Sequence, residues 1–363
     1  MRLLPTLTEL VARGQADLRM GLPVVLADDR GGGVLAIAAE VLGDARLAEL
    51  RARGAVVLAI TAWRAATLKA RAYDGDLARL TLPGGADAAW VRAIADPADD
   101  LRVPMKGPLH SLRDGPAGLH RLALLLAKSA ALLPAAVVVP VADARAEATA
   151  LNLTLLSAAA AAADVQAQHP LAPVAAAHLP LQASEDAKLH IFRPEDGGVE
   201  HYAIEIGRPP RPGPVLVRLH SACFTGDVLG SLKCDCGAQL HGALARMGTA
   251  GAGILLYLNQ EGRGIGLANK MRAYALQDQG FDTVEANHRL GFEDDERDFR
   301  TGAGLLRRMG IRSVQLLTNN PRKVRMMQAE GVEVAARVPL ITAANRHNAQ
   351  YLQVKRRKSG HLL

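Results

Sequence analysis

The sequence predicts two α/β domains, and three observations support this fold class. A single hydrophobic core rarely grows past about 250–300 residues, so a chain of 363 residues favours two domains. All five phenylalanines follow residue 190, whereas both tryptophans precede it, so the composition changes along the chain. In both halves, short apolar runs alternate with stretches of helical apolar spacing, which is typical of α/β proteins.

In the N-terminal half, three apolar runs have the length of buried strands. They predict strands over residues 23–27, 55–60 and 135–140. Apolar residues also recur at helical spacing in two longer stretches, which predicts helices over residues 36–53 and 119–133.

The C-terminal half shows the same alternation. Four runs predict strands over residues 215–220, 253–258, 313–318 and 332–336. Helices are predicted over residues 237–247, 265–279 and 321–330. Asn320 suits a helix N-cap and Pro321 the first helical position, so the last helix has a well-defined start.

A proline-rich stretch separates the two halves. Pro170, Pro173 and Pro180 fall in an otherwise alanine-rich region, which is typical of a linker. We therefore predict an N-terminal domain over residues 1–165, a linker over 166–179 and a C-terminal domain over 180–363.

The composition restricts the class of protein and its partners. The start of the chain is broken by Pro5 and Arg13, so we expect no secretory signal. No stretch reaches the roughly 18–20 apolar residues that a membrane span needs, so we expect no membrane partner. The chain has three cysteines, and thiols without disulfide pairing fit the reducing cytoplasm, so we expect a cytoplasmic protein. The formal net charge of +7 favours an anionic partner, either nucleic acid or a phosphorylated small molecule.

The three cysteines are the most informative residues of the chain, because Cys223, Cys234 and Cys236 lie close together in the sequence. Three thiolates at one point suit zinc, which binds sulfur at about 2.3 Å in tetrahedral geometry. Three protein ligands leave a fourth position for water, as in catalytic zinc sites. The alternative is that the three residues are small buried hydrophobes.

Two loops of the C-terminal half are candidates for phosphate binding. Gln260-Glu-Gly-Arg-Gly-Ile-Gly266 follows a predicted strand, and its glycines permit close approach of backbone N–H groups to a phosphate. Glu261 can accept from a base edge and Arg263 can bind a phosphate bidentately, although an ordinary turn is the alternative. Thr318–Lys323 predicts a phosphate-binding helix start, with an ordinary capped helix as the alternative.

These motifs lead to a family. Residues from about 180 to 363 resemble GTP cyclohydrolase II, the enzyme that opens riboflavin biosynthesis. The matching stretches occur in family order: Arg218-Leu-His-Ser, Cys223-Phe-Thr-Gly-Asp, Cys234-Asp-Cys-Gly, Gln260-Glu-Gly-Arg-Gly-Ile-Gly-Leu, Lys270-Met-Arg-Ala-Tyr-Ala-Leu-Gln-Asp, Asp282-Thr-Val-Glu-Ala-Asn-His, Asp295-Glu-Arg-Asp-Phe and Leu317-Thr-Asn-Asn-Pro. The resemblance implies a mixed sheet with helices and hydrolysis of GTP to formate, pyrophosphate and 2,5-diamino-6-(5-phosphoribosylamino)pyrimidin-4-one.

The resemblance also implies roles for individual residues. It implies one catalytic Zn²⁺ per chain held by Cys223, Cys234 and Cys236, and Mg²⁺ with the GTP phosphates. Asp295 is then the proton acceptor, Tyr274 is needed for the full reaction, and Arg297 is a nucleophile toward the α-phosphorus or an electrostatic stabiliser. The implied GTP contacts are Arg218, His220, Ser221, Gln239, Glu261, Gly262, Arg263, Thr283, Thr318 and Lys323. A homodimer is expected.

Three positions depart from the family pattern. Ala222 stands where the family usually has glutamate, Asn259 where arginine is common, and Lys233 where arginine is frequent. None of them removes an implied zinc ligand or changes Asp295 or Arg297. They bear on substrate affinity rather than on the type of reaction.

The N-terminal half resembles 3,4-dihydroxy-2-butanone 4-phosphate synthase in outline, through Gly21–Arg30, Ala38–Glu40 and Leu126–Val137. That synthase needs acids after its Asp-Asp pair to bind magnesium, and here the run is Arg30-Gly-Gly-Gly-Val34. The family's Gly-His-Thr-Glu appears as Gly118-Leu-His-Arg121. We therefore expect a synthase-like fold without synthase activity.

Two alternatives remain beside a cyclohydrolase with a degenerate N-terminal half. The first is a bifunctional enzyme that also makes 3,4-dihydroxy-2-butanone 4-phosphate, against which the missing acids argue. The second is a non-catalytic, zinc-containing GTP-binding or nucleic-acid-binding protein. Nucleic-acid binding calls for aromatic stacking surfaces, and aromatic residues make up only 3% of the chain.

Overall fold

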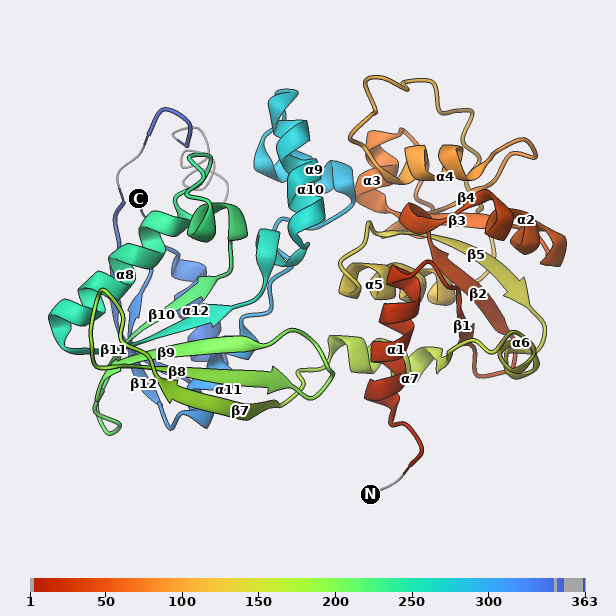
Figure 1. The fold of residues 1–363 in the computed structure, drawn as a ribbon. Helices are drawn as coiled ribbons and strands as arrows, with labels where there is room; N and C mark the ends of the chain where they lie inside the picture. Colours follow the sequence, from red (N-terminus) through yellow and green to blue (C-terminus); the bar gives the residue numbers. More distant parts are fainter. Residues whose placement is uncertain (1–2, 343–344, 349–361, 363) are drawn as a thin grey trace. The chain divides into compact units, whose positions relative to one another are not determined.

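The computed structural model describes residues 3–342, 345–348 and 362. The chain forms two compact units (Figure 1). Unit 1 takes its described residues from Met1–Ala167 and Ala268–Glu296, and unit 2 from Gln168–Leu267 and Arg297–Leu363. Each unit contains a mixed β-sheet with helices, which confirms the predicted α/β class.

The sheet of unit 1 has six strands in the order β4-β3-β5-β2-β1-β6. Neighbouring strands are antiparallel except for β1 and β6, which are parallel. The strands are β1 Val24–Ala27, β2 Gly33–Ala38, β3 Val57–Thr61, β4 Leu77–Thr81, β5 Ala135–Val141 and β6 Leu155–Ser157. The strands predicted over 23–27, 55–60 and 135–140 are therefore confirmed as β1, β3 and β5.

The helices of unit 1 cover the sheet or pack beside it. They are α1 Leu7–Arg19, η1 Ala39–Val41, α2 Asp44–Arg53, α3 Ala62–Thr67, α4 Ala88–Ala95, α5 Gly118–Ser129, α6 Ala144–Leu151, α7 Ala158–Gln166, α9 Leu267–Asp278 and α10 Thr283–Leu290. Residues of α1, α5 and α7 form one apolar core with Val34 and Ala36 of β2. Leu50 of α2 lies near Leu35 and Ile37, which point to the opposite face because side chains alternate along a strand.

The sheet of unit 2 has seven strands in the order β13-β12-β10-β11-β9-β8-β7. Strands β13, β12, β10 and β11 are mutually parallel, and β9, β8 and β7 continue the sheet in antiparallel fashion. The strands are β7 Leu171–His178, β8 Ala187–Pro194, β9 His201–Gly207, β10 Val215–Ser221, β11 Ala252–Leu258, β12 Ser313–Leu317 and β13 Glu333–Val338.

The helical segments of unit 2 are η2 Phe224–Val228, α8 Cys236–Ala250, η3 Glu261–Gly264, α11 Arg300–Arg308 and α12 Pro321–Ala329. Ala243 and Met247 of α8 pack on one face of the sheet with Leu255. Leu305 of α11 and Met327 of α12 belong to the core on the other face (Figure 1).

The strand order places a topological switch beside β10. The connection from β10 through α8 leads to β11 on one side, whereas the later strand β12 pairs with the other side of β10. In open α/β sheets, ligands bind at the carboxyl ends of strands at such a switch point. The residues that follow β10, β11 and β12 are therefore the first place to look for a site.

Two predictions about local structure differ from the observed fold. Residues 36–38, predicted as the start of a helix, complete strand β2, and the helix α2 begins only at Asp44. A short apolar run suits a buried strand as well as a helix, so periodicity alone does not separate them. Most of the predicted linker 166–179 is strand β7, which tolerates Pro173 because β7 lies at the sheet edge.

Candidate active site

The three cysteines converge after β10. The Sγ atoms of Cys223, Cys234 and Cys236 all lie within 4.8 Å of one another. Those of Cys223 and Cys234 are 3.7 Å apart. Two sulfurs on one tetrahedral zinc ion are separated by about 3.8 Å, given Zn–S bonds of about 2.3 Å. The spacing of the thiols thus fits a metal ion, which the three residues could bind.

A glycine makes room for this cluster. A Cβ atom on Gly226 would lie 2.7 Å from Sγ of Cys234 and 3.1 Å from Sγ of Cys223. Real Cβ atoms essentially never come so close, so any larger residue would displace the sulfurs. Gly226 sits in η2, the π-helical turn that brings the chain back toward α8.

Asp227 connects the cysteine loop to the sheet. Its carboxylate accepts hydrogen bonds from the backbone N–H of Cys223 and from the hydroxyl of Tyr257, each at 3.0 Å. It also lies 3.0 Å from Nε2 of His220. Burial lowers the pKa of His220, and burial together with the Asp227 charge raises the pKa of Tyr257. His220 is therefore neutral at physiological pH and Tyr257 keeps its proton.

Arg218 is a buried cation on β10. Its guanidinium donates to the carbonyl of Leu317 at 3.1 Å and to the side-chain oxygen of Gln239 on α8. Gln239 in turn donates to Asp235, the N-cap residue of α8. Burial lowers the pKa of Arg218 to about 10, so the side chain is still charged at neutral pH.

The loop after β11 adopts an unusual backbone. Gly262 and Arg263 have φ values of 63° and 64°, and a left-handed conformation at a non-glycine residue is uncommon. The Glu261 carboxylate accepts from the backbone N–H of Phe224 at 2.6 Å. This bond joins the loop to the residue that follows the first cysteine.

Two cations gather over one aromatic ring. The guanidinium carbon of Arg297 lies 4.8 Å from the centroid of Phe299, and Nζ of Lys323 lies 5.1 Å from it. Arg297 also donates to the Ser221 hydroxyl at 3.3 Å, and Lys323 donates to the Leu219 carbonyl at 2.9 Å. Both positive charges thus lie at the carboxyl end of β10, where they can neutralise an anion.

The helix start after β12 is buried. Thr318 is 4% exposed, and its hydroxyl accepts from the backbone N–H of Asn320, which caps α12. Three further polar atoms near these strand ends are buried without a hydrogen-bond partner within the described part of the chain: Nε of Arg218, Nδ1 of His220 and Oε1 of Gln260. Buried polar atoms normally find partners, so these atoms are suited to a polar ligand.

The predicted site residues divide between the two units. Unit 2 brings together at the strand ends Cys223, Cys234, Cys236, Arg218, His220, Ser221, Gln239, Glu261, Gly262, Arg263, Arg297, Thr318 and Lys323. Tyr274, Thr283 and Asp295 belong to unit 1. Nζ of Lys270 lies 5.7 Å from the ring centroid of Tyr274, and Thr283 begins α10 next to its N-cap Asp282.

Four residues of the site were not singled out from the sequence. Gly226 and Asp227 lie inside the Cys-Phe-Thr-Gly-Asp motif, which could have drawn attention to them. Phe299 likewise ends the Asp-Glu-Arg-Asp-Phe stretch. Tyr257 carries no local signal, because its role depends on strand pairing. Asn259, one of the departures from the family pattern, donates to the carbonyl of Glu200 and so has a structural contact.

Within residues 3–342, 345–348 and 362, no helix combines the length and the apolar character that crossing a membrane requires.

Comparison with known proteins gives consistent results. The family model of GTP cyclohydrolase II matches residues 172–339. An Azospirillum brasilense protein named GTP cyclohydrolase-2 is 45% identical over 360 residues, which is 97% of this chain and 93% of that protein. The GTP cyclohydrolase-2 of Pseudomonas aeruginosa (strain LESB58) is 53% identical over 190 residues, which is 52% of this chain and 92% of its own.

One solved structure also aligns along the chain. It is RibBX, a two-domain 3,4-dihydroxy-2-butanone 4-phosphate synthase from A. baumannii, with 18% identity and a TM-score of 0.34. The alignment covers 92% of this chain and 99% of that one. A similarity at this level carries no argument about the fold or the activity.

Proposed function

Because this chain belongs to the GTP cyclohydrolase II family, we propose that it hydrolyses GTP as the first step of riboflavin biosynthesis. The reaction opens the imidazole ring and releases formate and pyrophosphate, giving 2,5-diamino-6-(5-phosphoribosylamino)pyrimidin-4-one. The observation that carries the proposal is the convergence of three cysteine sulfurs after β10, the strand at whose carboxyl end Arg297 and Lys323 gather.

The proposed metal is zinc, held by Cys223, Cys234 and Cys236. When bound, zinc supplies Lewis-acid activation of the water that adds to C8 of guanine. Asp227 holds the backbone of Cys223 in place, and the buried His220 and the half-buried Tyr257 hold Asp227. Removal of the Asp227, His220 or Tyr257 side chain would loosen the loop that presents the sulfur of Cys223.

The proposed triphosphate site is the cationic end of β10. Arg297 and Lys323 neutralise the phosphates, which also bind Mg²⁺. Arg263 can bind a phosphate bidentately. Glu261 is the proposed acceptor for the guanine edge. Asp295 is the proposed proton acceptor, and Tyr274 the proposed tyrosine of the ring-opening stage.

The test is an assay of purified, zinc-loaded protein with GTP and Mg²⁺ that follows formate and pyrophosphate together. Equal release of both products is the expected result, and a Cys234→Ser variant should release no formate. If the wild-type protein binds GTP but releases neither product, the chain is a nucleotide-binding regulator and the proposal is wrong.

We further propose that unit 1 has no synthase activity. The stretch after the Asp28-Asp29 pair offers Arg30 and three glycines in place of carboxylates, and the Asp28 side chain accepts from the backbone N–H of Arg30 in a local turn. Incubation with ribulose 5-phosphate and Mg²⁺ should give no 3,4-dihydroxy-2-butanone 4-phosphate, whereas product formation would establish a bifunctional enzyme. We also propose that the protein is a cytoplasmic homodimer and that it has no nucleic-acid partner.

A further inference from the structure

Part of the cyclohydrolase sequence folds with the N-terminal half of the chain. Residues 268–296, here called the α9–α10 segment, belong to unit 1 together with residues 1–167. The segment lies inside the range matched by the family model and contains Tyr274, Thr283 and Asp295. Its contacts with the N-terminal fold therefore bear directly on residues proposed to act on GTP.

Helix α9 is attached through a buried amide and a guanidinium. Asn269 is 0% exposed and donates to the carbonyl of Ala131 at 3.1 Å. Arg272 donates to Asp96 at 2.8 Å and lies 3.0 Å from Glu40, so one cation joins two carboxylates of the N-terminal fold. All three charged side chains are less than a third exposed, which makes these bonds stronger than surface ion pairs.

Helix α10 is attached through an aromatic stack and a close backbone approach. The rings of Trp63 and His288 lie 3.6 Å apart and only 6° from parallel. At the end of the helix, a Cβ atom on Gly291 would lie 2.7 Å from the Thr61 hydroxyl and 2.9 Å from the Pro134 ring. The following Phe292 is 1% exposed, so the segment continues into the interior of unit 1.

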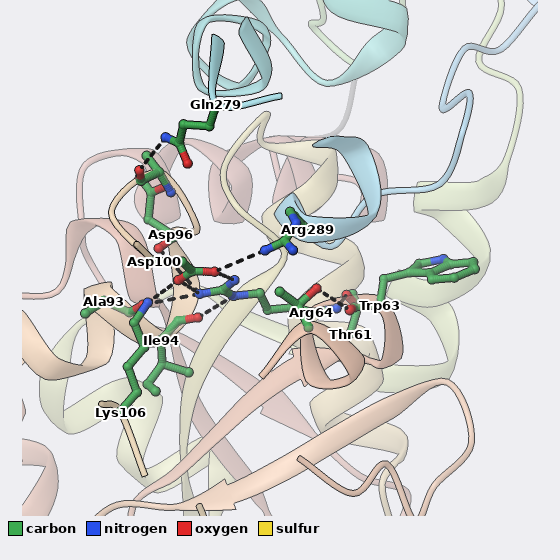
Figure 2. A network of polar contacts seen from close by, with 12 residues as sticks. Thr61, Trp63, Arg64, Ala93, Ile94, Asp96, Asp100, Lys106, Gln279 and Arg289 are labelled. Atoms are coloured by element: carbon green, nitrogen blue, oxygen red, sulfur yellow. Dashed lines mark hydrogen bonds and ion pairs between the residues drawn. The ribbon is translucent and has the colours of Figure 1, made fainter. Parts of the chain in front are cut away.

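A buried polar network lies next to Trp63 in the N-terminal fold (Figure 2). Arg64 is 1% exposed, donates to the Ile94 carbonyl at 2.7 Å and binds both carboxylate oxygens of Asp100. Lys106 binds the same carboxylate, and Arg289 of α10 approaches it to 4.0 Å. Arg64 and Trp63 are neighbours on α3, so the network that fixes Arg64 also fixes the ring on which His288 stacks.

The contacts are those of a specific docking surface. They combine a stacked ring pair, a cation shared by two carboxylates and a glycine whose replacement would clash. They come from separate parts of the N-terminal fold: η1, α3, the loop after α4 and the residues after α5. The Pseudomonas relative aligns over 92% of its own length with about half of this chain, so it has little sequence that could correspond to this fold.

We propose that the N-terminal fold positions the α9–α10 segment for the ring-opening reaction, with Trp63 and Asp96 as positioning residues. This inference rests on the proposed function, because it assigns the segment's Tyr274, Thr283 and Asp295 to the reaction. Neither Trp63 nor Asp96 needs to touch GTP. Each acts through the helix that it holds, and misplacement of a catalytic group by about 1 Å can cost a hundred-fold in rate.

The test compares four full-length, zinc-loaded variants with the wild type. Trp63→Ala removes the ring on which His288 stacks. Asp96→Asn removes one of the two carboxylate charges that pair with Arg272, and it keeps the side-chain oxygen that accepts from the backbone N–H of Ala98. Trp63→Phe keeps an aromatic ring. The matched control is Asp76→Asn, which breaks an Arg121–Asp76 pair of the same chemistry elsewhere on unit 1.

Two readouts are needed, namely amide hydrogen exchange over residues 268–296 and the kcat and KM for formate release. Trp63→Ala and Asp96→Asn should exchange faster in this segment and lose about ten-fold to a hundred-fold in kcat, with a smaller change in KM and unchanged zinc content. Trp63→Phe and Asp76→Asn should behave as the wild type.

Unchanged exchange in both test variants would overturn the docking surface, and faster exchange with unchanged kcat would overturn the positioning role. A wild-type protein that releases no formate would instead refute the proposed function. In that case the exchange data still decide whether Trp63 and Asp96 hold the segment.

Discussion

His220 and Asp227 form a buried pair in which Nε2 of the imidazole lies 3.0 Å from Oδ2 of the carboxylate and each side chain is 3% exposed. The pair joins strand β10 to the turn that carries the first cysteine. Because burial lowers the pKa of His220, the ring is a neutral hydrogen-bond donor to a charged acceptor. The carboxylate is thereby held in the orientation that accepts the backbone N–H of Cys223.

Replacement of Asp227 by asparagine should weaken metal binding. An amide has one acceptor oxygen and no charge, so it cannot serve Cys223, His220 and Tyr257 together. We expect zinc affinity to fall about ten-fold to a hundred-fold, as for other residues that orient a metal ligand. Competition with a chromogenic chelator measures this. Asp196→Asn, in the turn after β8, is the control, and equal zinc retention in both variants would contradict the role of Asp227.

Replacement of Gly226 by alanine should disrupt the cysteine cluster, because its Cβ would lie 2.7 Å from a sulfur. We expect the purified variant to contain less than half of the wild-type zinc while unit 2 stays folded. Metal analysis and circular dichroism measure the two quantities. Gly213→Ala is a matched control, since a Cβ there meets nothing within 4 Å. A fully metallated Gly226→Ala protein would show that the sulfurs can move apart at no cost.

Replacement of Arg297 by lysine separates the two roles considered for this residue. Lysine keeps the positive charge over Phe299 but loses the planar guanidinium. If the role is electrostatic, kcat should fall about ten-fold and pyrophosphate should still be released. If Arg297 is the nucleophile, pyrophosphate release should fall to the background of an Arg297→Ala variant. Arg300→Lys, close by at the start of α11, controls for general effects of the substitution.

The stability of unit 1 should depend on pH through His120. Burial and the nearby Arg79 charge lower the pKa of His120 from 6.5 to about 4. Between these values the unfolded chain binds more protons than the folded one, so stability is full above about 6.5 and falls as the pH drops toward 4. A His120→Gln variant should lose this part of the pH dependence of the melting temperature. The exposed His110→Gln should keep it, and parallel curves for His120→Gln and wild type would refute the assignment.

Much of this molecule could be predicted from sequence because the signals are local. The cysteine cluster, the loop that starts at Gln260 and the helix start at Pro321 are each formed by a short stretch of sequence. A buried parallel strand such as β11 is a nearly continuous apolar run, which is easily recognised. The α/β class and each of these motifs could be recognised from such short-range patterns.

The remaining features depend on contacts between residues that are far apart in the chain. Residues 36–38, the last three of β2, were predicted as the start of a helix because this buried strand is apolar on both faces and carries no alternation. Strand β7 resembled a linker because an edge strand exposes most of its side chains and accepts proline. The assignment of residues 268–296 to unit 1 could not be predicted, since Trp63 and His288 become neighbours only after folding.

The discontinuous chain path of unit 1 has a consequence for how such genes can be divided. A cut near residue 175 would separate α9 and α10 from the fold that buries Leu290 and Phe292, each 1% exposed. The excised C-terminal product would then present these side chains to water and tend to aggregate. The two halves of this chain are therefore not independent folding units. A protein that keeps residues 1–167 must also keep residues 268–296, which pack against them.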